Sequence, residues 1–349
     1  MSSVVRIVAM LAWLSGALLA PGCEQGAIAP EYSVPPPAQL VAAPALQREP
    51  LQPLPAAPVV DPKRAAIGRR LFAAQNLSGD GTVSCMTCHP LDRAGADGLM
   101  HSRGANGRET AVNTPTVYNV SFNFRFNWNG AYATLEDEFN APVTKTMDTT
   151  WDAICEKLRT DRALNGAFLG AYPDGVTTAN VKDALARYID TLVTPDCRFD
   201  QYLRGDPDAL SFQELRGYEM FKTLGCASCH QGANVGGNLF QRLGVMHDYF
   251  KDRVQRGGPA QTSADLGRFE TTNHPEDRHV FRVPSLRNVA LTPPYFHDGS
   301  VATLEQAVTK MGYLQLGRQL TAEQVSLVVA FLKTLTGLPS TALSLSVAP

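Results

Sequence analysis

Two five-residue stretches decide the fold of this chain: CMTCH at residues 85–89 and CASCH at residues 226–230. Each matches the Cys-x-x-Cys-His signature by which a c-type haem is attached. Two thiols three residues apart can bond to the two vinyl groups of one porphyrin, and the adjacent imidazole then reaches the iron from one side. One such motif could be a zinc or redox site, but two in one chain predict two covalently bound haems. The residues expected to attach and ligate them are Cys85, Cys88, His89, Cys226, Cys229 and His230.

The sequence around the two motifs repeats. The step from Pro115 to Thr134 equals the step from Pro284 to Thr303, 19 residues in both halves (115 to 134, 284 to 303). Equal spacing over matched blocks predicts duplication of one haem-binding unit. The matching segments are residues 67–72 with 216–221, 115–120 with 284–289, and 129–136 with 298–305.

The periodicity of apolar residues predicts a mainly α fold. Amphipathic helices are expected at residues 180–192, 212–223, 304–311 and 322–335, where apolar residues recur three or four apart. Residues 93–130 and 231–300 are rich in Gly, Asn and Pro and predict long ordered loops that wrap the haems. We expect two cytochrome c-like haem domains, N-terminal at 61–200 and C-terminal at 201–340, that arose by internal duplication.

Charge and composition exclude one class of partner. The 349 residues are 18% charged and carry a formal net charge of −2. No basic excess is present to neutralise phosphates, so we expect no nucleic-acid partner.

The N-terminus predicts export. Arg6 precedes an apolar run from Ile7 to Ala20, which is shorter than the ~20 residues of a comfortable membrane span. The run ends in LLAPGC, residues 18–23, which resembles a lipobox and makes Cys23 the expected lipid-anchored residue of a periplasmic protein. Pro21 departs from the usual pattern, so cleavage by signal peptidase I is the alternative. Residues 24–60 are rich in Pro and Ala and predict an extended linker, with a disordered leader as the alternative.

Two cysteines, Cys155 and Cys197, remain outside the haem motifs and the lipobox. An oxidising compartment would let them form a disulfide. Two unpaired buried thiols are the alternative.

The two halves differ at one decisive position. Met311 lies seven residues after Leu304, whereas Pro142, which cannot ligate iron, lies seven residues after Leu135. Met311 is therefore the expected distal ligand of the second haem, and a core methionine is the alternative. His/Met ligation raises the reduction potential, so the second haem should be reduced first.

From about residue 61 to residue 338 the chain resembles the bacterial dihaem cytochrome c peroxidase family, to which MauG-like enzymes also belong. The resemblance implies a low-potential peroxidatic haem in the N-terminal half. It also implies a high-potential C-terminal haem that takes electrons from a small cytochrome c or cupredoxin, and often a homodimer. The residues that carry it are 85–90, 95–98, 113–119, 128–130, 283–298 and 302–312.

The resemblance also implies roles for single residues. Trp128 matches a tryptophan that relays electrons between the haems, with a packing residue as the alternative. Asp148 stands where the family has an acid–base glutamate one methylene longer, and a surface residue at a helix start is the alternative. The implied calcium ligands are Asn113 through its side chain and Thr292 and Pro294 through their carbonyls, a hard-oxygen set. His297 is expected to support the second haem without bonding its iron.

One departure concerns activation. Family members that need reductive activation carry a distal histidine in the loop between Gly98 and Asn113, and the matching residue here is Ala105. We therefore expect an open first haem that is active without prior half-reduction. His101, four residues earlier, is an alternative ligand.

These expectations define a function and two rivals. The first is a peroxidase that reduces hydrogen peroxide to water. The second is a MauG-like enzyme that oxidises a partner protein; such enzymes have tyrosine at the position of Met311, and Tyr313 is a weak substitute. The third is a non-catalytic electron carrier with both irons six-coordinate.

Overall fold

The computed structural model describes residues 49–337. The predicted signal segment and lipobox at 1–23, and residues 24–48 of the predicted linker, lie outside this range. Among the described helices, none combines the length and the apolar character needed to cross a bilayer.

The first half is built on the pairing of α1 (Pro62–Ala73) with α6 (Thr178–Asp190). Asp61 caps α1 by accepting hydrogen bonds from the backbone of Lys63 and Arg64, and Pro62 stands at the first helical position. Their buried faces belong to one apolar cluster that extends from Ile67 to Leu192. The other elements of this half are α2 (Cys85–Cys88), α3 (Leu135–Glu138), a π-helical turn (Pro142–Thr146), α4 (Trp151–Thr160) and α5 (Arg162–Ala171).

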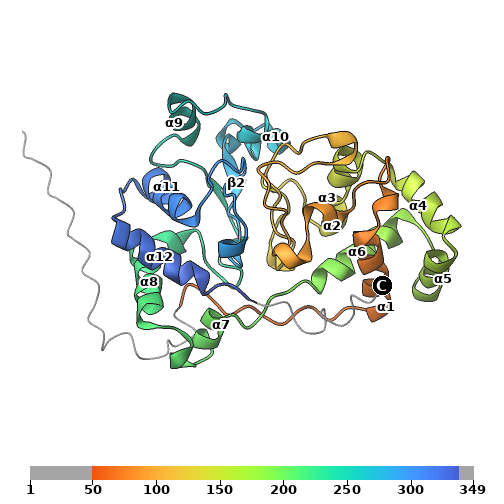
Figure 1. Ribbon diagram of the computed structural model, residues 1–349, viewed down its shortest axis with the longest axis horizontal. Helices are drawn as coiled ribbons and strands as arrows, with labels where there is room; N and C mark the ends of the chain where they lie inside the picture. Colours follow the sequence, from red (N-terminus) through yellow and green to blue (C-terminus); the bar gives the residue numbers. More distant parts are fainter. Residues whose placement is uncertain (1–48, 338–349) are drawn as a thin grey trace, which may run out of the picture. The chain divides into compact units, whose positions relative to one another are not determined.

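The second half repeats this plan with α8 (Phe212–Thr223) and α12 (Ala322–Lys333), which lie side by side in Figure 1. Each begins with a capping box, in which Ser211 pairs with Glu214 and Thr321 with Gln324. A second apolar cluster extends from Cys197 to Leu335, with Leu51 added from the N-terminal side. The other helices of this half are α7 (Arg198–Leu203), α9 (Tyr249–Gln255), α10 (Phe269–Thr272) and α11 (Leu304–Leu316).

Strands are few. β1 (Phe240–Arg242) pairs with β2 (Val280–Arg282) in an antiparallel ribbon, with Phe240 opposite Arg282. A third, smaller apolar cluster lies beside this ribbon and includes Phe281 and Phe296. Short 3₁₀ turns occupy Gln75–Leu77, Leu91–Arg93, Ala105–Gly107, Val120–Phe122, Pro207–Ala209, Cys226–Ser228, Ala264–Leu266, Pro275–Asp277 and Val289–Leu291.

The prediction of a mainly α protein is confirmed, although two details differ. The helix expected at 304–311 continues to Leu316, because Gly312 is buried in close contact with Leu320 rather than ending the helix. The loop expected at 231–300 contains the β1–β2 ribbon together with α9 and α10.

Both helix pairs approach closely at a glycine. A Cβ at Gly68 would lie 1.9 Å from the carbonyl oxygen of Ala184, and one at Gly217 would lie 2.1 Å from that of Leu327. No side chain larger than hydrogen fits at either position without separating the helices.

Local backbone geometry also matches between the halves. Asn119 and Asn288 are left-handed, with φ of 62° and 60°, and each immediately precedes a 3₁₀ turn. Gly130 and Gly299 have φ of 63° and 60°. In each half these two residues are eleven positions apart (119 to 130, 288 to 299).

The expected linker ends earlier than residue 60. Leu51 and Leu54 are fully buried, and Pro50 and Gln52 pair through their backbones with Gly232. The prediction of an extended linker is therefore wrong for residues 49–54, which form an N-terminal strap on the second half. The strap is stabilised by burial of its two leucine side chains, although its prolines made the segment resemble a solvated linker in the sequence.

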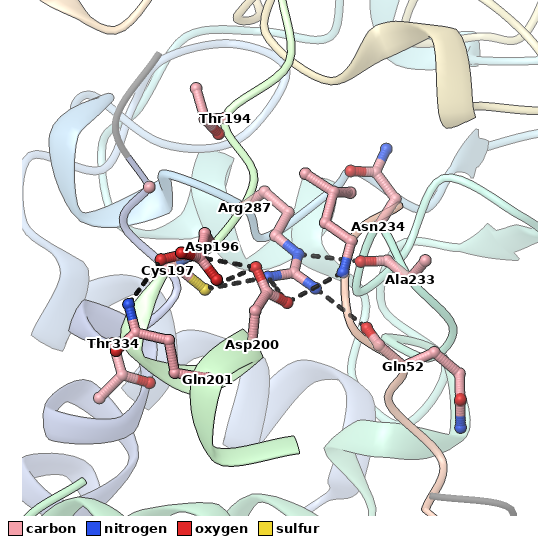
Figure 2. Close-up of polar contacts among 12 residues, drawn as sticks. Gln52, Thr194, Asp196, Cys197, Asp200, Gln201, Ala233, Asn234, Arg287 and Thr334 are labelled. Atoms are coloured by element: carbon pink, nitrogen blue, oxygen red, sulfur yellow. Dashed lines mark hydrogen bonds and ion pairs between the residues drawn. The ribbon is translucent and has the colours of Figure 1, made fainter. Parts of the chain in front are cut away.

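Arg287 holds this strap in place (Figure 2). Its side chain is 1% exposed, and its Nη1 lies 2.8 Å from Oδ1 of Asp200. Its Nη2 donates to the carbonyl of Gln52 at 3.0 Å and its Nε to that of Ala233 at 2.9 Å. The same Asp200 oxygen accepts from the backbone N–H of Leu54 at 2.9 Å. One buried ion pair thus joins the strap, α7 and the segment after the second haem motif.

The two remaining cysteines are free thiols in the structure. Cys155 is buried in the first apolar cluster, beside the hydroxyl of Thr178. Cys197 is buried in the second cluster, where its Sγ lies 3.1 Å from both Asp200 and Arg287. Burial raises the pKa of Cys197 to about 12, so this thiol stays protonated. The two cysteines are therefore buried thiols, as the alternative prediction stated, and do not form the disulfide.

Replacing Gly217 by alanine should destabilise the protein by about 1–3 kcal/mol, because the new methyl group overlaps the backbone of α12. Gly166 in α5 is the matched control, since nothing lies within 4 Å of a Cβ placed there. Gly166→Ala should stabilise the protein by about 0.5–1 kcal/mol through helix propensity. Urea unfolding followed by circular dichroism measures both, and equal effects would contradict the packing account.

Asp200→Asn should cost about 3–5 kcal/mol, because it leaves the Arg287 guanidinium buried without a counter-charge. The control is Asp196→Asn, which breaks an exposed pair with Arg204 whose side chains are 65% and 41% exposed. That change should cost about 0–1 kcal/mol. A loss below 1 kcal/mol in Asp200→Asn would show that the pair does not hold the strap.

Candidate active site

The first Cys-x-x-Cys-His motif forms a single helical turn ended by its histidine. Ser84 caps α2, with its backbone N–H donating to Thr87 Oγ1 at 2.9 Å. His89 Nδ1 lies 3.0 Å from the carbonyl oxygen of Gly95, which orients the ring and leaves Nε2 free for an iron atom. Burial lowers the pKa of His89, so the ring is the neutral form that binds metals.

The thiols of this motif suit haem attachment better than redox exchange. Burial, together with the neighbouring Cys88, raises the pKa of Cys85 to about 12. Burial also raises the pKa of Cys88 itself, with nearby Asp97 adding to the effect. A catalytic dithiol needs a lowered pKa and an exposed thiolate, which this environment opposes.

The second motif has the same chemistry. Burial raises the pKa of Cys226 to about 11 and lowers that of His230 to about 4, so both are uncharged at neutral pH. The backbone at Val235 and Pro284 lies beside the His230 ring. Both sites therefore offer two cysteine thiols and one neutral imidazole, the donor set that a c-type haem requires.

Met311 lies in the middle of α11 and packs against the third apolar cluster, as Trp128 does. The neighbouring Tyr313 is engaged elsewhere, because its ring stacks on that of His247 with centroids 4.0 Å apart. In this part of α11, the Met311 thioether is therefore the candidate iron ligand, because the Tyr313 ring is stacked on His247.

Trp128 from the first half meets His297 from the second. Their ring centroids are 6.4 Å apart in an edge-to-face arrangement. Both residues lie 13 positions after the matched prolines (115 to 128, 284 to 297), so they occupy corresponding places in the two halves. Trp128 Nε1 donates to the carbonyl of Asn113 at 2.8 Å, which fixes the indole at this junction.

His297 belongs to a buried charge network. Its Nε2 lies 2.7 Å from Oδ1 of Asp265, and Arg253 pairs with both Asp265 and Asp298. Although burial alone would raise it, hydrogen bonds from His297 and Arg253 hold the pKa of Asp265 well below its ordinary value. Among the described residues this is a group that could hold a metal ion, but the Arg253 guanidinium already supplies the positive charge.

The residues expected to bind calcium lie near one another. The side chain of Asn113 donates to the carbonyl of Leu99 at 2.8 Å, and the backbone N–H of Asn113 donates to the carbonyl of His297 at 2.8 Å. Gly98 lies against the carbonyl of Pro293, between Thr292 and Pro294. The structure thus brings the 98–113 loop to the 292–294 segment.

Asp148 is held by the loop in which this chain has Ala105 at the position of the distal histidine of some family members. It has a left-handed φ of 51° and a side chain that is 41% exposed. Its carboxylate accepts from Asn106 Nδ2 at 3.0 Å and lies 3.6 Å from Arg108. Ala105 in the same loop is buried, whereas His101 is half-buried and its Nδ1 has no hydrogen-bond partner within the described chain.

Sequence reasoning missed two charged residues, Glu138 and Arg282. Arg282 is 5% exposed; its backbone N–H donates to the carbonyl of Trp128 and its Nε to that of Asn127. Arg282 Nη1 and Glu138 Oε2 are both buried and have no hydrogen-bond partner in residues 49–337. Extending the alignment of the two halves beyond residue 136 would have identified Glu138, because it aligns with the apolar Ala307 of the second half.

Comparisons with known proteins show which family the chain resembles. The profile of a family described as di-haem cytochrome c peroxidase matches residues 62–208. The chain is 41% identical to cytochrome c peroxidase Ccp of Escherichia coli over 84% of its own length and 63% of that protein's. It is 40% identical to cytochrome c551 peroxidase of Nitrosomonas europaea, covering 83% of this chain and 84% of that one. A solved MauG-like protein associated with microbial copper homeostasis superposes with a TM-score of 0.70 at 28% identity, over 84% of this chain and 94% of that one.

Proposed function

Because this chain belongs to the di-haem cytochrome c peroxidase family, we propose that it reduces hydrogen peroxide to water with electrons from a small periplasmic redox protein. The observation that carries the proposal is the contrast between α11, which bears Met311, and the corresponding turn of the first half, which bears Pro142. A haem bound in the second half would be closed by the sulfur of Met311, while one bound in the first half would keep a face for peroxide.

Each haem has a defined set of residues in this proposal. Cys85 and Cys88 attach the first haem and His89 ligates it; Cys226 and Cys229 attach the second, with His230 and Met311 as its ligands. Residues 61–200 and 201–340 are the two haem domains, and their matched glycines and left-handed asparagines support an origin by duplication.

The overall reaction joins H2O2, two protons and two electrons to give two waters. A bound haem supplies the redox-active iron. The chain's own residues orient it, exclude side reactions and deliver protons and electrons. Trp128, in contact with His297, relays electrons from the second half to the first. Asp148, 41% exposed, exchanges protons between solvent and the peroxide side of the first haem.

Calcium binding is proposed at the contact between the 98–113 loop and the 292–294 segment. The side-chain oxygen of Asn113 and the carbonyls of Thr292 and Pro294 are hard oxygen donors, and water would complete the shell. An ion there would fix the backbone of Asn113, which in turn holds the indole of Trp128.

Location and assembly follow from the family and from the N-terminus. We place the enzyme in the periplasm, anchored through lipidated Cys23, with a small cytochrome c or a cupredoxin as donor and a homodimer as its assembly. The buried strap at residues 49–54 would fix the tether to the second half, where electrons enter.

Two rival functions are less well supported. A MauG-like oxidation of a partner protein is favoured by the resemblance to a MauG-like structure, but Tyr313 is stacked on His247 and Met311 stands at the ligand position. A pure electron carrier needs a side-chain ligand on the first haem; Ala105 and Pro142 offer none, so His101 would have to supply it.

Peroxide-dependent oxidation of a reduced small cytochrome c by the purified protein tests the proposal directly. We expect turnover without prior reduction of the enzyme. No consumption of peroxide, with or without prior reduction, would overturn the proposed function.

Met311→Ala should convert the second haem from low-spin to high-spin and lower its reduction potential, because a thioether ligand is lost. Met220→Ala is the control, since it removes a buried methionine of α8 that is only 5% exposed. The control should lower stability and leave the absorption spectrum unchanged. An unchanged spectrum in Met311→Ala would remove this residue from the ligand set.

Asp148→Ala should lower kcat/KM for peroxide by ~10–10²-fold, because proton delivery slows and the 105–108 loop loses its anchor. Arg108→Ala, which removes the charge 3.6 Å from Asp148 and a hydrogen bond to the carbonyl of Lys145 but leaves the Asp148 carboxylate in place, separates the two effects. It should loosen the loop but keep most of the activity. Full activity in Asp148→Ala would exclude a catalytic role.

A further inference from the structure

Glu138 and Arg282 are opposite charges that lie near each other; Arg282 is buried, whereas Glu138 is partly exposed and only its Oε2 is fully buried. Each has a buried polar atom with no hydrogen-bond partner in the described residues, and no ion pair within 4.0 Å joins them there. An unpaired buried charge is costly unless something else occupies the space beside it. Such a pair therefore indicates a place where a small polar molecule belongs.

The helical run after Trp128 places Glu138 on the side expected to face the first haem. Glu138 ends α3, and Phe139 and Ala141 are helical and connect it to the π-helical turn that begins at Pro142. Residues four apart in a helix share a face, so Glu138 lies one turn before Pro142 on the same side. π-helical turns also concentrate at functional sites.

The second half supplies the comparison. Both Met311 and Pro142 lie eight residues after the N-cap threonine (303 to 311, 134 to 142), and Ala307 and Glu138 both lie four after it. Ala307 is buried in the cluster that Met311 packs against. The face that carries a thioether ligand and a small apolar residue in one half therefore carries a proline and a carboxyl group in the other.

We propose that Glu138 is a catalytic acid–base residue of the peroxide reaction, with Arg282 as its positioning counter-charge. The proposal rests on the function proposed above and names a group that moves the proton within bound peroxide. The carboxylate of Glu138 would accept the proton of one peroxide oxygen and return it to the other oxygen. The O–O bond would then break, and the oxygen that gained the proton would leave as water with the electron pair of that bond.

The remaining oxygen is reduced to water by two electrons from the small redox protein and two protons from solvent, so the reaction balances at one H2O2, two electrons and two protons. Arg282 stabilises the negative charge that develops as the peroxide loses its proton. Glu138 regains its carboxylate form at the end of each transfer and is ready for the next peroxide.

The protonation of Glu138 suits this role. Burial raises its pKa to about 7, and the positive charge of Arg282 opposes that rise. The groups that face it are Arg282 from β2 and Tyr132 from the preceding loop, where burial and then Glu138 raise the pKa of the phenol. An acid–base group is most effective when its pKa lies near the working pH.

The test is the rate of cyanide binding to the oxidised holoprotein between pH 5 and pH 8, followed by absorption spectroscopy. Neutral hydrogen cyanide must lose its proton to bind iron, so the wild-type rate should rise as pH passes through about 7, where Glu138 becomes a carboxylate. Glu138→Gln keeps the size of the side chain but cannot take the proton. It should give a slow, pH-independent rate and lower kcat/KM for peroxide by ~10²–10⁴-fold.

Two further variants make the test specific. Asp137→Asn removes an exposed charge from the same helix and should behave as the wild type. Arg282→Gln removes the charge that lowers the pKa of Glu138, so the rise in cyanide binding should move to higher pH. A rise that persists in Glu138→Gln, or that disappears in Asp148→Asn instead, would overturn the inference. Failure of the wild type to bind cyanide or turn over peroxide would instead overturn the proposed function.

Discussion

An iron atom held by one protein side chain can take peroxide on its other face only if the chain leaves that face free. In this account, whether that face stays free depends on whether one helix in each half carries a side chain that can ligate the iron. In the second half α11 runs through Met311 as a full helix, while in the first half α3 stops after Glu138 and gives way to a π-helical turn at Pro142. Proline has no side-chain atom that could ligate a metal, and the helical run continues past Ala141 only as a π-helical turn. In the proposed function, the division of labour between the two haem sites follows from that difference.

The junction between the halves has the polar character that electron and proton transfer need. Trp128 and His297, at corresponding positions, meet edge to face, and each is fixed by its own hydrogen bonds. Arg282 links the backbone of Trp128 to the region of Glu138, so the electron relay and the proton transfer proposed above would share one set of supports. Elsewhere the Arg287–Asp200 pair ties the N-terminal strap to the second half.

The sequence was sufficient for features that depend on local pattern. The haem motifs, the repeat and helices such as 212–223 were predicted from spacing and periodicity alone. α5 was missed because Gly166 and Gly170 dilute its apolar face, although Asp161 caps it well. The strap at 49–54 was missed because its prolines resemble a linker, and its burial depends on residues far along the chain. Glu138 stands in the acidic run Glu136, Asp137, Glu138, which resembles a solvated helix start; only the folded chain reveals that one of the three has a buried carboxylate oxygen and lies near Arg282.

The central claim is that the two irons differ in ligation, and electron paramagnetic resonance of the oxidised protein as isolated tests it most directly. The account predicts one high-spin and one low-spin ferric signal in equal amounts, with only the high-spin signal converted by added cyanide. Two low-spin signals that persist unchanged with cyanide, under oxidised and half-reduced conditions alike, would contradict it.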